Sequence, residues 1–275
     1  NQKKIVSTGF NIALTKAKGN IIIRLDGHAE FPPDYFKKCL KALIKKKTYC
    51  VGGIIIYKYK GIIGESIKIA QSSNFGVGGV TFRKKNIKAK FVDTLAFGAY
   101  DRKIFELMGG YDEELIKNQD DEFNFRMNQK GYKIWIDPQI KSVYHSRDSF
   151  RKLFMQYFLY GFYKVRVMQK RNGFSSWRHM VPAAFIICLI FSIAHKFTNL
   201  NITIFDIIPQ FYIVLNIIFA IIEISKSDER YTFKKRINLF FSLILSVLII
   251  HLSYGFGFIL GSIYFIKKWK NNKLI

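Results

Sequence analysis

The chain has 275 residues, of which 49% are hydrophobic, enough for one large domain or two small ones. Lys and Arg number 44 against 19 Asp and Glu, so the formal net charge of +25 calls for nucleic acid, anionic lipid or a phosphorylated substrate as partner. Cys39, Cys50 and Cys188 are odd in number and lack a C-x-x-C spacing, so the sequence indicates neither a disulfide framework nor a structural zinc site. Cysteines of this kind suit a reducing compartment, so we expect the catalytic part to face the cytoplasm.

The first four residues are polar or basic, no apolar signal-peptide core follows them, and the chain does not begin with Met. Residues 7–17 predict a helix, because apolar residues recur at helical spacing before Gly19. This helix leads directly into the apolar run 20–25. We therefore expect the chain to start inside a domain, after that domain's first strands.

The run 20–25 ends abruptly in Asp26-Gly27-His28. Its branched aliphatic residues have no helical spacing, which favours a buried central strand. Ligands of open α/β sheets bind outside the carboxyl ends of the strands, so we expect a site here. Asp26 and His28 offer a carboxylate oxygen and an imidazole nitrogen, a partial shell for Mg²⁺ or Mn²⁺ that leaves room for a substrate phosphate. A strand that simply ends in a polar turn is the alternative.

The next two predicted elements continue an alternating order. Pro32 and Pro33 precede a predicted helix at 34–47, and residues 49–57 predict a second strand. The order helix, strand, helix, strand favours an α/β fold with a mostly parallel sheet and helices on both of its faces.

Between residues 58 and 92 the pattern loosens, and the glycines at 76–79 predict a flexible turn. A basic cluster follows it, comprising Arg83, Lys84, Lys85, Lys88 and Lys90. The turn is either a phosphate cradle or a plain mobile loop, because its spacing matches neither a P-loop nor a dinucleotide fingerprint. Residues 91–100 then predict a strand, and 101–108 a short helix closed by two glycines.

Three consecutive acids, Asp120, Asp121 and Glu122, are conspicuous in a chain with only 19 acids. They open a predicted helix, where the helix dipole favours negative charge, so simple capping is one interpretation. A general base is the other, because grouped carboxylates are a common way to prepare one. Residues 131–136 and 138–144 predict a final pair of strands that ends at His145, which either completes a metal shell or is structural.

Residues 148–179 combine an aromatic apolar face with many basic residues and almost no acids. This composition is typical of an amphipathic helix in the membrane interface, attracted by anionic lipid headgroups. Packing against the preceding domain is the competing interpretation, and both can hold at once.

Three apolar segments follow, at 180–195, 202–224 and 237–266. The third has no Lys, Arg, Asp or Glu and is too long for one upright span, because a span needs ~20 residues. Basic residues flank it on both sides, and the positive-inside rule places both flanks in the cytoplasm. We therefore expect it to form a hairpin about Gly255 and Gly257, while the first two segments form another. These segments favour lipid over nucleic acid as the anionic partner.

Several phrases, taken together, resemble the family-2 glycosyltransferases, and more narrowly their bacterial membrane-bound branch. The phrases are Ser7-x-Gly9-x-Asn11-x-Ala13, Ala17-x-Gly19, Arg24-Leu25-Asp26-Gly27-His28-Ala29, Phe75-Gly76-Val77-Gly78-Gly79, Val92-Asp93-Thr94, Phe97-Gly98-Ala99-Tyr100, Gly109-Gly110-Tyr111-Asp112-Glu113 and Asn118-Gln119-Asp120-Asp121-Glu122-Phe123. The resemblance runs from about residue 5 to about residue 180.

The resemblance implies a GT-A fold, incomplete here at its amino end, with a nucleotide-sugar donor, foremost a UDP-sugar. It also implies a divalent metal, Mg²⁺ or Mn²⁺, and an inverting displacement at the anomeric carbon. The family's Asp-x-Asp metal motif falls on Asp26 and His28, and its base motif falls on 118–123. Asp120 is then the expected base, with Asp121 in reserve.

Further residues are expected around the two substrates. The donor-binding candidates are Asn11, Arg24 and Asp26, and the candidate metal ligands are Asp26, His28 and His145. The acceptor-binding candidates are Gln119, Arg147, Gln156 and Tyr160. The resemblance implies a polyprenyl-diphosphate-linked acceptor at the cytoplasmic membrane face, whose diphosphate would attract Arg147, Arg151 and Lys164. The region 156–161 lacks the Gln-x-x-Arg-Trp phrase of processive synthases, which favours addition of one sugar in exopolysaccharide or cell-surface glycan synthesis.

The expected organisation has four parts: a glycosyltransferase domain at 1–147, an interface region at 148–179, a transmembrane region of 3 to 4 segments at 180–266, and a basic cytoplasmic tail at 267–275. In the family, the strands that hold the nucleotide base come before the position that matches residue 1 of this chain. Residues 1–275 alone are therefore expected to bind the donor poorly. The alternative is a truncated, catalytically inactive membrane protein that binds anionic lipid or an assembly partner.

Overall fold

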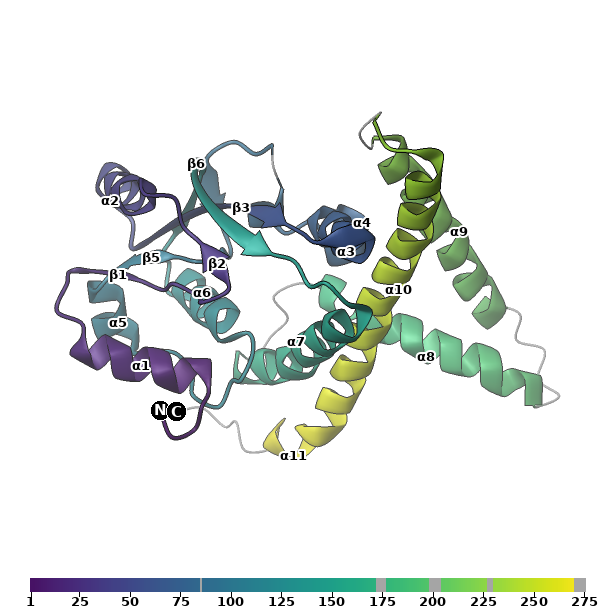
Figure 1. Ribbon diagram of the computed structural model, residues 1–275. Coiled ribbons are helices and arrows are strands. Elements are labelled where there is room, and N and C mark those ends of the chain that lie inside the picture. Colours follow the sequence, from purple (N-terminus) through teal and green to yellow (C-terminus); the bar gives the residue numbers. More distant parts are fainter. Residues whose placement is uncertain (85, 172–176, 198–203, 227–229, 270–275) are drawn as a thin grey trace. The chain divides into compact units, whose positions relative to one another are not determined.

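The computed structural model describes residues 1–84, 86–171, 177–197, 204–226 and 230–269 (Figure 1). The chain divides into two compact units. The first comprises Asn1–Lys58 and Gly79–His145, and the second Tyr59–Gly78 and Ser146–Ile275. The first unit therefore ends two residues before the expected boundary at 147, and it excludes residues 59–78.

The first unit is built on a six-stranded sheet in the order β1-β5-β3-β6-β2, with β4 also paired to β6. The strands are β1 (Ile21–Ile23), β2 (Ala29–Glu30), β3 (Cys50–Lys58), β4 (Lys90–Val92), β5 (Ala99–Asp101) and β6 (Ile134–His145). Only β3 and β6 pair in parallel among the described strands. The α/β class is confirmed, but the expectation of a mostly parallel sheet is wrong, because the sheet is mixed.

The sheet is mixed because its strands run in two directions. Strands β1, β3 and β6 share one direction, since β1 and β3 both run antiparallel to β5 and β3 runs parallel to β6. Strands β4 and β5 run in the other direction, because β4 is antiparallel to β6 and β5 is antiparallel to β1 and β3. The predicted strand 91–100 is thus two short strands. The hydrophobic pattern predicts strands but carries no information on their direction.

Strand β6 joins what the sequence predicted as two strands. Its pairing with β3 shifts register between Gly52 and Ile54, opposite the segment that contains Pro138. Proline cannot donate to the ladder and is confined to edges and irregular positions of sheets. At Gly53 a Cβ would overlap the carbonyl oxygen of Ile140, so only glycine fits against this irregular segment.

Helices cover both faces of the sheet, as expected. They are α1 (Val6–Lys16), α2 (Tyr35–Lys46), α5 (Lys103–Met108) and α6 (Gln119–Gln129), with a short 3₁₀ turn η1 (Thr81–Arg83). Figure 1 shows α2 on one side of the sheet and α1, α5 and α6 on the other. Successive strand residues enter opposite cores, as Cys50 and Ile134 do on one face and Val51 and Trp135 on the other.

The second unit is helical. It contains α3 (Gly61–Ser72), α4 (Asn74–Val77), α7 (Phe150–Lys170), η2 (Trp177–His179), α8 (Val181–Ala194), η3 (His195–Phe197), α9 (Ile204–Ser225), α10 (Phe233–Tyr264) and α11 (Ile266–Trp269). Helices α3 and α4 replace the loose segment that the sequence predicted, and Gly76 of the expected flexible turn lies within α4. The helix α3 forms because Ile67 and Ala70 pack against α10, far away in the sequence.

Helix α10 runs without a break, so the expected hairpin about Gly255 and Gly257 is wrong. These glycines serve close packing instead. A Cβ at Gly257 would overlap the carbonyl oxygen of Phe158 in α7, and one at Gly255 would overlap that of Pro182 in α8. Small residues allow two helix backbones to approach closely, which is why glycine here marks a contact and not a break.

Three segments are long and apolar enough to cross a membrane: Trp177–Phe197, Phe205–Ser225 and Phe233–Tyr264. They correspond to the three apolar segments of the sequence. Parts of other expectations lie outside the described residues, namely Lys85 of the basic cluster, 172–176 of the interface region, 227–229 of the basic loop and 270–275 of the tail.

Candidate active site

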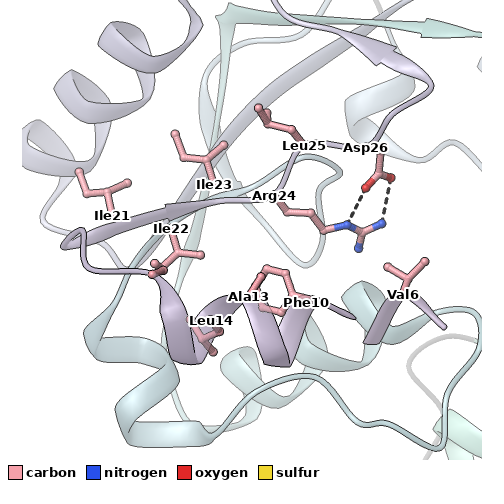
Figure 2. Close-up of a pocket in the computed structure, with 11 residues that line it drawn as sticks. Val6, Phe10, Ala13, Leu14, Ile21, Ile22, Ile23, Arg24, Leu25 and Asp26 are labelled. Carbon is pink, nitrogen blue, oxygen red and sulfur yellow. Dashed lines mark hydrogen bonds and ion pairs between the residues drawn. The ribbon is translucent and has the colours of Figure 1, made fainter. Parts of the chain in front are cut away.

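The candidate site lies at the carboxyl end of β1, where the apolar strand gives way to Arg24-Leu25-Asp26. These residues line a cavity of about 560 Å³ between β1 and α1. Figure 2 shows apolar side chains of α1, among them Phe10 and Leu14, along this cavity, and the charged pair Arg24 and Asp26 at one end. A site at the carboxyl end of this strand is the position that the sequence predicted.

Arg24 joins the two acidic motifs. Its Nε donates to Oδ1 of Asp26 at 2.8 Å, and its Nη2 donates to Oδ2 at 2.9 Å, a two-point ion pair. Its Nη1 lies 3.8 Å from Oδ2 of Asp120. The side chains of Arg24 and Asp26 are only 15% and 19% exposed, while that of Asp120 is 37% exposed. The structure thus brings together three of the predicted site residues around one guanidinium group.

Tyr111 lies behind this group, with the guanidinium carbon of Arg24 5.9 Å from its ring centroid. Burial raises the pKa of Tyr111 to about 12, against the opposing charge of Arg24, so its phenol stays protonated at neutral pH. Burial alone would lower the pKa of Arg24, but Asp120, Tyr111 and Asp26 raise it above its usual value. Sequence analysis did not single out Tyr111, although it stands in the quoted phrase 109–113.

The acids at the amino end of α6 lie in different surroundings. Asn118 precedes the helix in a left-handed conformation with φ 63°, and Oδ1 of Asp120 accepts the backbone N–H of Asp121 at 3.0 Å. Glu122 is fully buried and forms an ion pair with Arg126 at 3.3 Å. Asp120 therefore faces Arg24, whereas Glu122 is part of the core.

The side-chain amide of Asn11 forms hydrogen bonds with other residues of this chain. Its Nδ2 donates to the carbonyl of Tyr111 at 2.8 Å and to Oε1 of Glu113 at 3.1 Å, while its Oδ1 accepts the N–H of Tyr111 at 2.8 Å. These bonds hold the loop that leads toward α6 against α1. Contact of Asn11 with a donor stays a prediction.

The expected metal shell of Asp26, His28 and His145 is not assembled, because each side chain has another neighbour. The ring of His28 lies edge-on against Tyr144, at 5.4 Å between centroids, and Nε2 of His145 lies 2.6 Å from Oε1 of Glu30. The pairing of β2 with β6 places these two partners, since Glu30 and Tyr144 lie on the paired strands. No group of three His, Cys, Asp or Glu side chains suited to a metal occurs in the described part of the chain.

Asp26 nevertheless fits one mode of metal binding. Mg²⁺ is usually held by one or two carboxylates together with substrate phosphates and waters, so a complete protein shell is not required. Both carboxylate oxygens of Asp26 are bonded to Arg24, and a cation at Asp26 requires this pair to open.

Three acceptor candidates form one hydrogen-bonded series in the second unit. Nε of Arg147 donates to Oε1 of Gln156 at 3.2 Å, and Nε2 of Gln156 donates to the hydroxyl of Tyr160 at 3.0 Å. Gln119, the fourth candidate, is the first residue of α6 in the first unit. Its Oε1 is buried and accepts no hydrogen bond from the described residues.

Residues 1–108 match the family model "Glycosyl transferase family 2".

Two curated proteins show the wider similarity. The chain is 28% identical over 188 residues to the succinoglycan biosynthesis protein ExoA of Rhizobium meliloti (strain 1021), covering 67% of this chain and 56% of that protein. It is also 28% identical over 198 residues to the dolichyl N-acetyl-alpha-D-glucosaminyl phosphate 3-beta-D-2,3-diacetamido-2,3-dideoxy-beta-D-glucuronosyltransferase of Methanococcus voltae, covering 69% of this chain and 60% of that protein. The chain therefore spans less than two thirds of either relative.

Proposed function

We propose that this chain belongs to an inverting glycosyltransferase that moves one sugar from a nucleotide-sugar donor, foremost a UDP-sugar, to a polyprenyl-diphosphate-linked saccharide. The observation that carries the proposal is that Asp26 and Asp120 both form ion pairs with the Arg24 guanidinium. The two relatives support it, because one is named for succinoglycan biosynthesis and the other for glycosyl transfer to a dolichyl-phosphate-linked sugar.

Asp120 is the proposed general base. It is the most exposed member of the triad with Arg24 and Asp26, and it lies at the amino end of α6. It would accept the proton of the acceptor hydroxyl as that oxygen attacks the anomeric carbon. Asp121, one residue further along α6, is the reserve.

Asp26 and Arg24 are the proposed donor side of the site. When bound at Asp26, Mg²⁺ or Mn²⁺ would neutralise the charge on the departing diphosphate. Arg24 would orient Asp26 and add positive charge beside the diphosphate, because a guanidinium fork matches phosphate as well as carboxylate. Contact of Asn11 with the donor belongs to the same proposal.

The series Arg147, Gln156 and Tyr160 is the proposed acceptor side, together with Gln119. Ser149 caps α7 between Arg147 and Gln156, so the helix start lies within this series. A charged guanidinium just before a helix rich in aromatic and basic residues suits a lipid-linked diphosphate at the membrane surface. We place the catalytic domain in the cytoplasm, on a multi-pass membrane protein whose residues 148–179 contact anionic lipid.

The proposal is tested with membranes that contain the full-length protein, labelled nucleotide sugars and membrane lipid extract, with and without Mn²⁺. We expect label to pass into lipid from one donor, and Asp120→Asn to abolish this transfer while nucleotide-sugar binding persists. Asp121→Asn is the matched control, with the same chemical change one residue away. Retained transfer by Asp120→Asn excludes the base assignment. No transfer from any donor favours the inactive membrane protein instead.

A further inference from the structure

Helix α10 contacts α3 along its first half. Nζ of Lys235, near the start of α10, lies 3.5 Å from Oε2 of Glu65 in α3. Further along, the hydroxyl oxygens of Ser246 and Ser66 lie 2.8 Å apart. Buried apolar side chains of both helices belong to one cluster. The first half of α10 is therefore fixed to a helix that carries charged residues.

The second half of α10 contacts α7 in the same way. The backbone at Gly257 is so close to Phe158 that a Cβ would overlap its carbonyl oxygen. At the far end, Nε2 of Gln169 donates to the carbonyl oxygen of Phe265 at 3.0 Å. Contacts with α3 and α7 together extend from Lys235 to Phe265, the whole length of α10.

These contacts conflict with a membrane crossing by α10. A crossing needs ~20 residues, so any crossing segment of this 32-residue helix takes in its middle and much of one half. If the first half of α10 lay in lipid, Glu65 and Lys68 of α3 would lie in lipid too. Burying the second half takes Lys164 and Arg166 of α7 with it. Charged side chains at membrane depth are costly and rare.

The other two apolar helices differ from α10. Within its apolar window, 44% of α10 is buried in the protein, against 17% for Trp177–Phe197 and 11% for Phe205–Ser225. Figure 1 shows α8 and α9 on the opposite side of α10 from α3 and α7. Only α8 and α9 therefore have the nearly complete apolar exposure of helices surrounded by lipid.

We propose that α10 lies in the plane of the membrane, along the cytoplasmic leaflet, and that α8 and α9 alone cross it as a hairpin. This inference rests on the membrane location of the proposed function. The face of α10 left uncovered is an apolar stripe of Ile237, Phe241, Leu245, Phe256, Leu260 and Ile263. Basic residues at 230–236 and 267–268 flank the stripe, and both flanks then face the anionic headgroups of the same leaflet.

The test is the sidedness of the two ends of α10 in the full chain. Cysteines introduced at Lys234 and at Lys268, in a Cys188→Ala background that keeps only the buried Cys39 and Cys50, are labelled with a membrane-impermeant maleimide in inside-out and right-side-out vesicles. Lys41→Cys marks the catalytic side, and Lys196→Cys marks the turn after α8. We expect labelling at 41, 234 and 268 from one side and at 196 from the other. Labelling of 234 and 268 from opposite sides overturns the inference.

A depth measurement makes the test independent of labelling efficiency. Nitroxide labels at Phe241→Cys and Leu260→Cys are separated by roughly 28 Å along the helix axis, at ~1.5 Å per residue. Equal accessibility to oxygen and to a water-soluble nickel reagent is expected at both, since an in-plane helix holds them at one depth. A large difference in depth contradicts the inference but leaves sugar transfer unaffected. A chain that does not sediment with membranes contradicts the membrane location itself.

Discussion

Nη1 of Arg24 lies 3.8 Å from Oδ2 of Asp120, while the other two nitrogens of the same guanidinium bond to Asp26. Two carboxylates therefore share one positive charge, and the group as a whole carries a net negative charge. An anionic nucleotide diphosphate can approach such a group only with additional positive charge. Asp26 is where a cation would supply it, and Arg24 is what that cation has to displace.

The first prediction concerns this competition. Arg24→Gln should tighten the binding of Mn²⁺ alone about tenfold or more, because a hydrogen bond to a charged group contributes ~1.5–3 kcal/mol. Arg24→Lys keeps the charge but loses the two-point geometry, so its affinity should lie between those of the wild type and Arg24→Gln. Electron paramagnetic resonance of free Mn²⁺ measures the affinities without any turnover.

Arg83→Gln is the matched control for Arg24→Gln. Arg83 donates to the hydroxyl of Tyr57 at 2.7 Å, so the substitution removes the same charge from another place in the same unit. Its Mn²⁺ affinity should stay near that of the wild type, and Asp26→Asn should abolish the tighter binding. Equal affinities of Arg24→Gln and Arg83→Gln would show that the ion pair does not compete with the cation.

The second prediction concerns Asn11. Asn11→Ala should lower the free energy of unfolding by ~1–3 kcal/mol, because it leaves the N–H and the carbonyl of Tyr111 without their partner. Hydrogen exchange should quicken in residues 109–115, which these bonds hold. Thr15→Ala, at a hydroxyl that bonds only to the carbonyl of Ile12 within the same helix, is the control. Unchanged exchange in the loop would exclude the holding role.

The third prediction concerns the stability change caused by Gly257→Ala. Its sign differs between a glycine in an open helix and a glycine in a close helix contact. Gly→Ala in an open helix stabilises by ~1 kcal/mol through helix propensity. At Gly257 the added Cβ overlaps the carbonyl oxygen of Phe158, so we expect Gly257→Ala to destabilise by ~1–3 kcal/mol. Thermal unfolding in detergent measures the sign. Leu260→Ala, at a side chain that is 48% exposed, should change the midpoint much less. A stabilised Gly257→Ala would mean that α7 and α10 do not pack closely.

Gly257 also illustrates what the sequence could and could not predict. The apolar strand before Asp26 and the acids at the start of α6 have local signals, so their elements and their place at a carboxyl strand end were predictable. A glycine inside an apolar run has no such signal, because a break and a close helix contact require the same residue. Only the partner helix α7 decides between them.

Partners distant in the sequence decided the remaining differences. Ile67 lies in a segment with a weak local pattern, and α3 forms there because α10 covers it. The ion pair of Glu30 with His145 depends on the pairing of β2 with β6, which hydropathy does not encode. The meeting of Arg24 with Asp120 likewise follows from the packing of α6 beside β1. The sequence suggested both residues, but only as members of separate motifs.

The last prediction concerns pH and Glu113. Its carboxylate accepts hydrogen bonds from Lys3 at 3.0 Å, from Asn11 at 3.1 Å and from Thr8 at 3.0 Å, and these lower the pKa of Glu113 in the folded chain. A carboxyl whose pKa is lowered on folding adds stability above its unfolded pKa, about 4.3. That stability is lost as the pH falls through the lower folded value.

The unfolding free energies of the wild type and Glu113→Gln should therefore differ by a constant amount above about pH 5, with the wild type more stable. The difference should close as the pH falls below about 4. Lys3→Ala removes the largest cause of the lowered pKa of Glu113, so in that background the difference should be smaller and should close at a higher pH. Denaturant unfolding in detergent at a series of pH values measures it. A difference that stays constant down to pH 3 would show that Glu113 stabilises the α1 contact through packing and not through its charge.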